Sequence, residues 1–223
     1  MEYQVSFKVN DNIYLRDPES SELGKEIIKN SIELICELGF EQFTFKKLAI
    51  YMCTTEASIY RYFENKHRLL LYILNWYWNY MTFLVHLNLQ NLKDPSQKLK
   101  LIIHLLTKEL PDKTGNSEYN MKFLYQIILV ESSKVYLIKE VNEINKNNVY
   151  KAYKDLCARI ADVIYEYNPK YPYAHSLSSS LIEMAHHQQY FVEHLPRLTN
   201  APKKNNADYT TKFLEHLIFK TIQ

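Results

Sequence analysis

Three residues between positions 40 and 70 stand where helices could begin. Thr44, Thr55 and Asn65 each carry a side-chain oxygen of the kind that accepts a hydrogen bond from the free N–H groups of a helix start. Their spacing allows two short helices with a tight joint, followed by a longer third helix. This is the layout of a helix-turn-helix, whose second helix lies in the DNA major groove. The spacing therefore predicts DNA binding.

Cations follow two of these three caps, where acidic side chains are the ordinary choice. Residues 46–47 are both lysine, and residues 66–68 read Lys-His-Arg. Because a helix start carries a partial positive charge, each cation there costs about 0.3–1 kcal/mol in an isolated protein. A phosphate docked on the free N–H groups would offset that cost. The alternative is that these are solvated lysines on an ordinary helical protein.

The composition is that of a helical globular protein. The 223 residues are 47% hydrophobic and include only 3 glycines and 7 prolines, which favours long helices and few hairpins. The formal net charge of +2 does not by itself indicate a nucleic-acid partner. The basic charge is local, because residues 44–68 carry a net charge of +3 whereas residues 1–43 carry −5.

Several classes of protein are disfavoured. The three cysteines, Cys36, Cys53 and Cys157, form no C-x-x-C pair and indicate neither a disulfide scaffold nor a zinc site, which suits a reducing cytosol. The first residues lack the shape of a signal peptide, and the most apolar run, residues 69–92, is too polar for a membrane span. We therefore expect a cytoplasmic protein with no membrane partner.

No enzyme motif is recognisable. The sequence contains no G-x-S-x-G, P-loop, H-E-x-x-H or dinucleotide-binding glycine pattern. Glu183, His187 and His194 lie at helical spacing, but histidines at a helix interface are more common than a metal site of this kind. We predict no catalytic residue, no cofactor and no metal.

Hydrophobic periodicity predicts an all-α protein. Residues 22–38 have the three-four spacing of an amphipathic helix, and Gly39 is a natural stop for it. Behind the two short helices, further helices are expected over residues 66 to beyond 84, 97–110, 118–138 with a break at 131–133, 141–167, 174–195 and 207–222.

The chain is expected to form two domains behind an N-terminal extension. Residues 3–9 alternate and residues 13–15 could pair with them, so the extension, residues 1–20, is either a short β-hairpin or a flexible arm. A DNA-binding domain is expected over residues 21–83, with the helix-turn-helix at about 44–63. Residues 84–223 would form a C-terminal helical domain.

An ordered set of residues carries a family resemblance. It consists of Thr44, Ala49, Thr55, Ile59-Tyr-Arg-Tyr-Phe63 and Asn65-Lys66. At this spacing the set resembles the TetR family of bacterial transcription regulators, over about residues 22 to 75. As a set it is far more specific than any lone motif. One position departs from the family: Cys53 replaces the usual turn glycine, so we expect either a strained left-handed cysteine or a rebuilt joint.

The resemblance implies DNA-contacting roles, position by position. Arg61 could bind a guanine edge through two hydrogen bonds, Glu56 could accept from cytosine N4, and Ala57 could pack on a thymine methyl. For Tyr60, packing at the core edge is the alternative, and for Arg61 it is a surface ion pair with Glu64 or Glu56. The implied phosphate-contacting residues are Thr44, Lys46, Tyr62 and Lys66, and the implied groove-facing residues are Thr55, Glu56, Ala57, Ser58 and Arg61, with Tyr60 beside them.

The resemblance also implies a C-terminal domain that binds a small effector and dimerises through its last two helices. A two-fold dimer suits a palindromic operator, with recognition helices about 34–36 Å apart or a multiple of this. The alternative is that the same apolar residues close one chain's own core. The expected dimer residues are Leu177, Leu181, Met184, Phe191, Phe213, Leu214, Leu217 and Ile218.

Aromatic residues are abundant, with 19 Tyr and 10 Phe. Some could line an apolar effector pocket with hydroxyl groups as polar anchors, although for each one taken singly an ordinary core or boundary position is the favoured interpretation. The candidates are Trp76, Tyr80, Phe83, Phe123, Tyr125 and Tyr153.

The function expected is that of a homodimeric regulator that binds double-stranded operator DNA. By family frequency it would be a repressor, released by a small apolar ligand of unknown identity. The alternative is a helical protein–protein adaptor that keeps the fold without binding DNA. Strong salt dependence of DNA affinity would favour the regulator.

Overall fold

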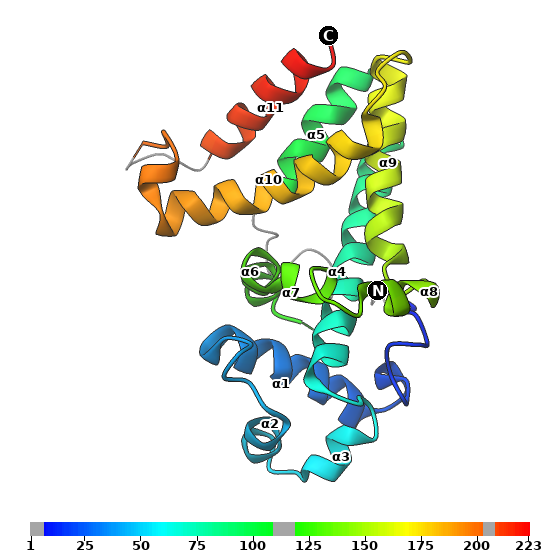
Figure 1. The fold of residues 1–223 in the computed structure, drawn as a ribbon, viewed down its shortest axis with the longest axis vertical. Helices are drawn as coiled ribbons and strands as arrows, with labels where there is room; N and C mark the ends of the chain where they lie inside the picture. Colours follow the sequence, from blue (N-terminus) through cyan, green and yellow to red (C-terminus); the bar gives the residue numbers. More distant parts are fainter. Residues whose placement is uncertain (1–6, 109–118, 203–207) are drawn as a thin grey trace. The chain divides into compact units, whose positions relative to one another are not determined.

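The computed structural model describes residues 7–108, 119–202 and 208–223 (Figure 1). Within these ranges the regular structure is entirely helical, as the sequence predicted. In chain order the elements are η1 (Pro18–Ser20), α1 (Glu22–Leu38), α2 (Phe45–Tyr51), α3 (Glu56–Tyr60), α4 (Lys66–Leu89), α5 (Pro95–Thr107), α6 (Met121–Glu131), α7 (Ser133–Tyr136), α8 (Val141–Lys146), α9 (Lys151–Tyr167), α10 (Ala174–His194), η2 (Pro196–Leu198) and α11 (Tyr209–Thr221).

The chain divides into two compact units. The first comprises Met1–Trp78 and Glu109–Ala152 and contains α1 to α3, the first half of α4, and α6 to α8. The second comprises Asn79–Lys108 and Tyr153–Gln223 and contains the rest of α4, α5, nearly all of α9, and α10 with α11. None of the helices in the described ranges has the length and apolar character needed to cross a membrane.

Helix α1 organises the first unit and begins and ends where the sequence predicted. The hydroxyl of Ser21 accepts the N–H of Gly24 at 3.2 Å at its start, and Gly39 ends it with a φ of 77° and an N–H donated to the carbonyl of Ile35 at 2.8 Å. Its buried face packs against α2 and α6. Helix α1 thus supports the pair of short helices, α2 and α3.

In the second unit, α10 packs against both α5 and α11 (Figure 1). Helices α5 and α11 also contact each other, and there the hydroxyl groups of Thr107 and Thr211, both buried, bond to each other at 2.6 Å. Lys108 forms an ion pair with Asp208 at the neighbouring surface. Polar contacts inside an apolar interface fix the register of the helices, because a slip would leave buried hydroxyl groups unpaired.

The reading of the extension as a hairpin is wrong for residues 7–15, which contain no strand. Instead Ile13 is buried, and the N–H of Leu15 donates to the carbonyl of Tyr62 at 2.8 Å. The alternation of apolar and polar residues predicted a strand because it indicates that one side of a segment is buried. In the structure the segment lies beside the end of α3, and its apolar side is buried without forming a strand. Residues 1–6, which hold most of the first expected strand, lie outside the described residues.

One helix predicted from the sequence is divided into two helices in the structure. The helix predicted over residues 141–167 ends at Lys146 as α8, and α9 begins at Lys151. Between them Asn148 has a φ of 54°, a left-handed conformation that asparagine tolerates better than most residues and that breaks a helix. The break predicted near 131–133 is confirmed, because α6 ends at Glu131 and α7 begins at Ser133.

Candidate nucleic-acid interface

The cap predicted at the start of α2 is confirmed. The hydroxyl oxygen of Thr44 accepts the N–H of Lys47 at 3.2 Å. Lys46 and Lys47 are both exposed, and Nζ of Lys47 donates to the carbonyl of Gln42 at 2.8 Å. Lys46 makes no hydrogen bond or ion pair with any described residue. A phosphate could therefore approach this helix start without displacing an internal contact of Lys46.

Helix α3 is also capped as predicted. Thr55 Oγ1 accepts the N–H of Ser58 at 3.3 Å and bonds to its hydroxyl at 2.9 Å. Of the groove-facing candidates, Glu56 and Ala57 are exposed and Ser58 is half-buried. The single buried side chain of the helix is Ile59. One short helix thus has one side fixed in the core and the other open to solvent.

Arg61 is exposed at the end of α3 and forms no ion pair within the described part of the chain. The surface ion pair weighed as an alternative is not present there, since Glu64 pairs instead with Arg68 at 3.8 Å. An exposed guanidinium with five free donors can still bind two acceptors of a guanine edge. Its role in base recognition stays a prediction.

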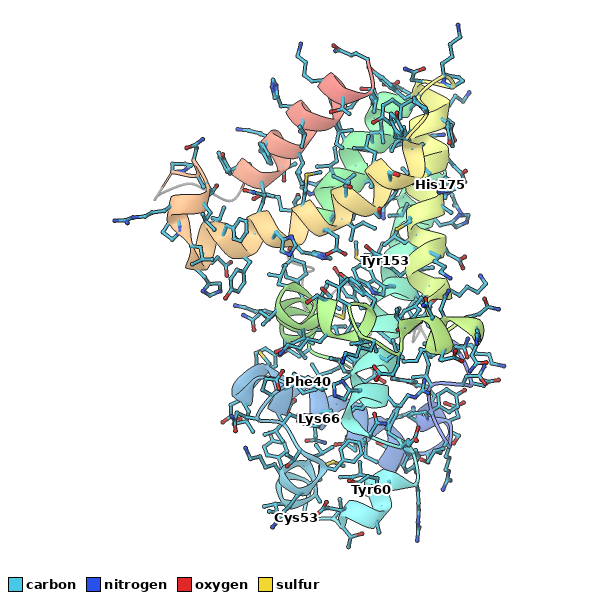
Figure 2. All side chains as sticks on the ribbon, viewed as in Figure 1. Phe40, Cys53, Tyr60, Lys66, Tyr153 and His175 are labelled. Atoms are coloured by element: carbon cyan, nitrogen blue, oxygen red, sulfur yellow. The ribbon has the colours of Figure 1, made fainter. Side chains whose placement is uncertain are left out.

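The placement of Tyr60 is compatible with both interpretations given above, packing at the core edge and contact with DNA. Its ring packs edge-on against Phe45, with ring centres 5.0 Å apart, yet the side chain remains 48% exposed (Figure 2). The packed edge orients the ring, and the exposed hydroxyl is free to reach a partner outside the chain.

The joint between α2 and α3 is built around a left-handed cysteine. Cys53 has a φ of 52°, its N–H donates to Ile50 at 3.1 Å, and the N–H of Thr54 donates to Ala49 at 2.9 Å. These two bonds form a Schellman motif with Cys53 at the position that usually holds glycine. Of the two outcomes expected for this departure, the structure has the strained cysteine (Figure 2), and a side chain there costs about 1–2 kcal/mol.

Tyr62, for which the resemblance implies a phosphate contact, is buried, so that contact stays a prediction that would require the residue to be uncovered. The residue is 2% exposed, its hydroxyl bonds to the hydroxyl of Ser21 at 2.7 Å, and the guanidinium of Arg16 lies 5.4 Å from the centre of its ring. The N-terminal extension, residues 7–20, covers this tyrosine. No sequence signal placed the extension there, because the contact spans some forty residues and leaves no periodic pattern.

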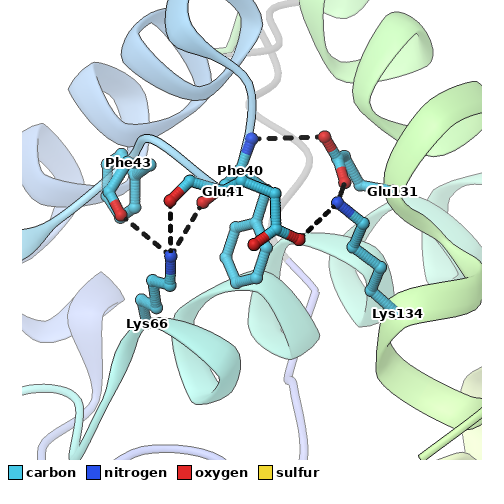
Figure 3. A network of polar contacts seen from close by, with 6 residues as sticks. All are labelled: Phe40, Glu41, Phe43, Lys66, Glu131 and Lys134. Atoms are coloured by element: carbon cyan, nitrogen blue, oxygen red, sulfur yellow. Dashed lines mark hydrogen bonds and ion pairs between the residues drawn. The ribbon is translucent and has the colours of Figure 1, made fainter.

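Lys66 binds inward at the start of α4. Its Nζ donates to three carbonyl oxygens of the loop after α1, those of Phe40 at 2.9 Å, Glu41 at 3.1 Å and Phe43 at 3.1 Å (Figure 3). The ammonium also lies 4.7 Å from the centre of the Phe40 ring. An ammonium has three donors, so this set occupies all of them. The phosphate contact implied by the resemblance stays a prediction that would require Lys66 to exchange partners.

The same loop is held from its other side by α6 and α7 (Figure 3). The buried carboxylate of Glu131 accepts the N–H of Phe40 at 3.2 Å and pairs with Nζ of Lys134 at 2.8 Å, and Lys134 also binds the carboxylate of Glu41 at 2.8 Å. Burial alone would lower the pKa of Lys134, but its hydrogen bonds to the two carboxylates outweigh burial and raise that pKa. We call residues 40–43 the clamped loop.

The predicted effector-pocket residues fall in both units and are described within each. In the first unit, Trp76 packs edge-on against Tyr119 with ring centres 5.0 Å apart, Tyr125 is buried and Phe123 is half-buried. In the second, Tyr80 is buried and the hydroxyl of Tyr153 donates to Glu183 at 2.8 Å. Phe83 lines a surface groove of about 550 Å³ together with Asp155, Arg159 and Asp162.

The predicted dimer residues separate into two groups. Leu181, Leu214 and Ile218 are fully buried by their own chain and hold α10 and α11 in the core. The other five are half-buried and so have surface left for a second copy: Leu177, Met184, Phe191, Phe213 and Leu217. The dimer prediction rests on this second group.

No described group of three His, Cys, Asp or Glu side chains has the arrangement of a metal site. The two short helices, their caps and their exposed face instead define a helix-turn-helix of the DNA-binding kind. Residues 27–73 match the family model described as "Bacterial regulatory proteins, tetR family". The resemblance seen in the sequence is therefore confirmed over residues 27–73, which lie in the first unit.

Solved structures share the fold over most of the chain. AibR in complex with isovaleryl coenzyme A and operator DNA is 15% identical, with a TM-score of 0.57 over 86% of this chain and 97% of that one. The fatty acid degradation regulator FadR from Bacillus halodurans is 18% identical, with a TM-score of 0.59 over 86% and 92%. A TerR/AcrR-family transcriptional regulator from Aquifex aeolicus VF5 is 14% identical, with a TM-score of 0.50 over 88% and 97%. Among curated protein sequences, none matches.

These findings show that the chain shares a TetR-like fold and contains, over residues 27–73, a helix-turn-helix region of the kind found in bacterial regulatory proteins.

Proposed function

We propose that the protein is a cytoplasmic homodimer that represses transcription by binding a palindromic operator through α3 and is released by a small apolar ligand. The observation that carries the DNA-binding half of this proposal is the exposed face of α3. Thr55 caps the helix, Glu56 and Ala57 face solvent, and Arg61 has no partner in the described chain. The proposed function is binding of DNA and of a small ligand, and it involves no catalysis, cofactor or metal.

Phosphate contacts would come from Thr44 and Lys46 at the start of α2 and from Tyr60 at the end of α3. Thr44 and Lys46 are exposed, and Tyr60 is half-exposed with its ring held by Phe45. Tyr62 and Lys66 are less direct candidates, because both already have internal partners. Phosphate contacts set the register of α3 on the duplex, and base contacts set the sequence that it reads.

The release step is supported by analogy with the solved relatives. The AibR complex contains isovaleryl coenzyme A, and FadR is described as a fatty acid degradation regulator. Apolar acyl compounds are therefore the first ligands to test on this chain. The residues proposed to contact this ligand are the six aromatic candidates, Trp76, Tyr80, Phe83, Phe123, Tyr125 and Tyr153. The proposed functional organisation of the chain is an extension over residues 1–20, a DNA-binding domain over 21–83 and a C-terminal domain over 84–223.

Selection of bound DNA from a random pool tests the main proposal. An enriched sequence with two-fold symmetry supports a dimer on a palindrome, and half-sites about one helical turn apart or a multiple of it would match the expected spacing. Enrichment of no sequence, together with weak and salt-insensitive DNA binding, would favour the adaptor alternative.

The Arg61→Ala variant tests which residue reads the sequence. We expect the loss of specific binding, since one bidentate base contact contributes about 1–3 kcal/mol of discrimination in each half-site. Fluorescence anisotropy with the selected operator and with a scrambled duplex measures it. A variant that kept full affinity and selectivity at physiological salt would remove Arg61 from the readout.

Light scattering tests the dimer. A monomer at micromolar concentration would contradict it. Replacing the half-buried Phe191 or Leu217 with a charged residue should weaken association without unfolding the chain, whereas the same change at the fully buried Leu214 should also unfold it.

A further inference from the structure

A cavity of about 540 Å³ lies in the first unit, beside the first two turns of α4. This volume is within the range of small-molecule sites. None of the six aromatic residues proposed for the effector pocket lines it. Its walls come from the start of α4 and from α7 and α8: Glu64, Asn65, His67, Arg68, Leu71, Lys134, Val135, Ile138, Glu140, Glu143 and Ile144.

The cavity combines an apolar wall with one arginine. Leu71 and Val135 are buried, and Ile138 and Ile144 are half-buried across from them. Arg68 keeps 26% of its side chain exposed, so it can be reached from the cavity that it lines. Apolar walls with a few placed polar groups are the usual composition of a ligand site.

Arg68 has fewer partners than a guanidinium normally has, because its one ion pair, with Glu64, leaves Nη1 without an acceptor. Its Nη1 is buried from solvent, and no described residue accepts a hydrogen bond from it. The nearest carboxylate, that of the exposed Glu64, lies 3.8 Å from Nε, which is too far for a hydrogen bond. Arginine stays charged in proteins, so deprotonation cannot relieve this shortage of acceptors. A bound anion would supply them.

The other charges around the cavity are compensated or face solvent. Lys134 is paired with Glu131 and Glu41, and Glu143 is paired with Lys146 at 2.7 Å. His67 is exposed and packs edge-on against Phe40, with ring centres 5.1 Å apart. Glu64 and Glu140 are exposed at the rim, where water and salt screen them. Arg68 is therefore the cation of the lining that has a donor left without an acceptor, and the exposed acidic side chains disfavour highly charged anions.

We propose that this cavity binds a small organic monoanion with an apolar body, of the medium-chain carboxylate class. The carboxylate pairs with Arg68 in the planar two-bond geometry that guanidinium favours, and the apolar body lies against Leu71, Val135, Ile138 and Ile144. The site belongs to the unit that carries the helix-turn-helix. Its existence does not depend on the proposed operator or on the release step.

Ligand-observed NMR on the full chain tests the site, with hexanoate as probe and hexan-1-ol and hexylammonium as neutral and cationic matches. We expect hexanoate to bind and the two matched compounds to bind at least tenfold more weakly. Arg68→Gln should weaken hexanoate binding at least tenfold. Arg159→Gln is the control, because Nε of Arg159 is likewise buried without a partner but lies in the groove of the second unit.

A second variant keeps the test decisive if Arg68→Gln fails to fold. Ile138→Asp places a negative charge on the half-buried wall without altering Arg68 and should also weaken hexanoate at least tenfold. Equal binding of all three probes, or hexanoate binding unchanged in either folded variant, overturns the proposal. Hexanoate binding lost instead on Tyr153→Ala would place the ligand at the aromatic residues and overturn it too. Anisotropy on the selected operator, measured without hexanoate, reports separately on the proposed function.

Discussion

Helices α2 and α4 begin alike in sequence and differently in structure. Each has a capping side chain followed within three residues by cations, and each cap forms: Thr44 accepts from Lys47, and Asn65 accepts from Arg68 at 3.0 Å. At α2 the lysines stay exposed. At α4, Lys66 bonds to the clamped loop and Arg68 lines a cavity.

This difference between α2 and α4 shows that a cation at a helix start does not by itself indicate a phosphate contact. The electrostatic cost of placing it there can be offset by a phosphate, but it can equally be offset by backbone carbonyl oxygens of a nearby loop. The sequence alone does not separate these cases, because the loop partner lies some 25 residues away. Within the described part of the chain, the start of α2 has in Lys46 an exposed cation whose ammonium makes no internal contact.

The largest expected effect comes from Lys66→Met. The change leaves three carbonyl oxygens of the clamped loop without their donor, and hydrogen bonds to a charged group contribute about 1.5–3 kcal/mol. We expect the free energy of unfolding to fall by about 2–4 kcal/mol, measured by urea denaturation. Lys46→Met is the matched control at α2 and should change it by less than about 0.5 kcal/mol. Equal effects of the two variants would remove the distinction.

Glu131→Ala tests the other side of the clamped loop. It leaves the N–H of Phe40 and the ammonium of Lys134 without their buried acceptor, and we expect a loss of about 2–3 kcal/mol in unfolding free energy. Glu131→Gln keeps an acceptor for Phe40 and should lose less. Because Lys66 and Glu131 hold one loop, the double variant should depart from additivity by more than about 0.5 kcal/mol. Additive losses would mean that the two sides act separately.

Lys46→Met should instead weaken DNA binding. Loss of one phosphate contact lowers the slope of log affinity against log salt by about 1 per subunit and weakens all sequences alike. Anisotropy titrations over a range of salt concentrations measure this slope. A slope identical to that of the unmodified protein would show that the exposed lysine does not contact phosphate.

The smallest expected effect is that of Cys53→Gly, which tests whether the joint between α2 and α3 is ordinary apart from its strain. Glycine adopts the left-handed conformation without penalty but gains freedom in the unfolded chain, so we expect a net stabilisation of about 0.5–1 kcal/mol. Thermal unfolding measures it, and operator affinity should not change. Destabilisation would show that the exposed thiol makes a contact worth more than the backbone strain.

Local signals predicted local structure well. The caps Thr44 and Thr55, the full extent of α1 and the break after Glu131 follow from neighbouring residues and periodicity, and all are confirmed. The left-handed conformation at Cys53 is one of the two outcomes expected from comparing this residue with the glycine that the family prefers there, and the structure decides between them.

Long-range contacts were not predictable from the same signals. Tyr62 is buried because the N-terminal extension lies on it, and Lys66 turns inward because the clamped loop offers three oxygens. The helix expected over residues 141–167 is interrupted at Asn148, whose left-handed backbone conformation breaks a helix, although asparagine as a residue type fits a helical sequence pattern. Periodicity reports which side of an element is buried, and it does not report what buries it.

The clamped loop also has a consequence for the order in which the chain acquires its structure. Phe40 and Glu131 are 91 residues apart, and Glu41 and Lys134 are 93 apart. Contacts of such separation form late, because the intervening chain must be ordered first. During synthesis, the segment that positions α2 therefore emerges from the ribosome long before half of its support does. A nascent chain can form its helix caps at once, but it completes the contacts that hold the loop before α2 only after α6 and α7 have been made.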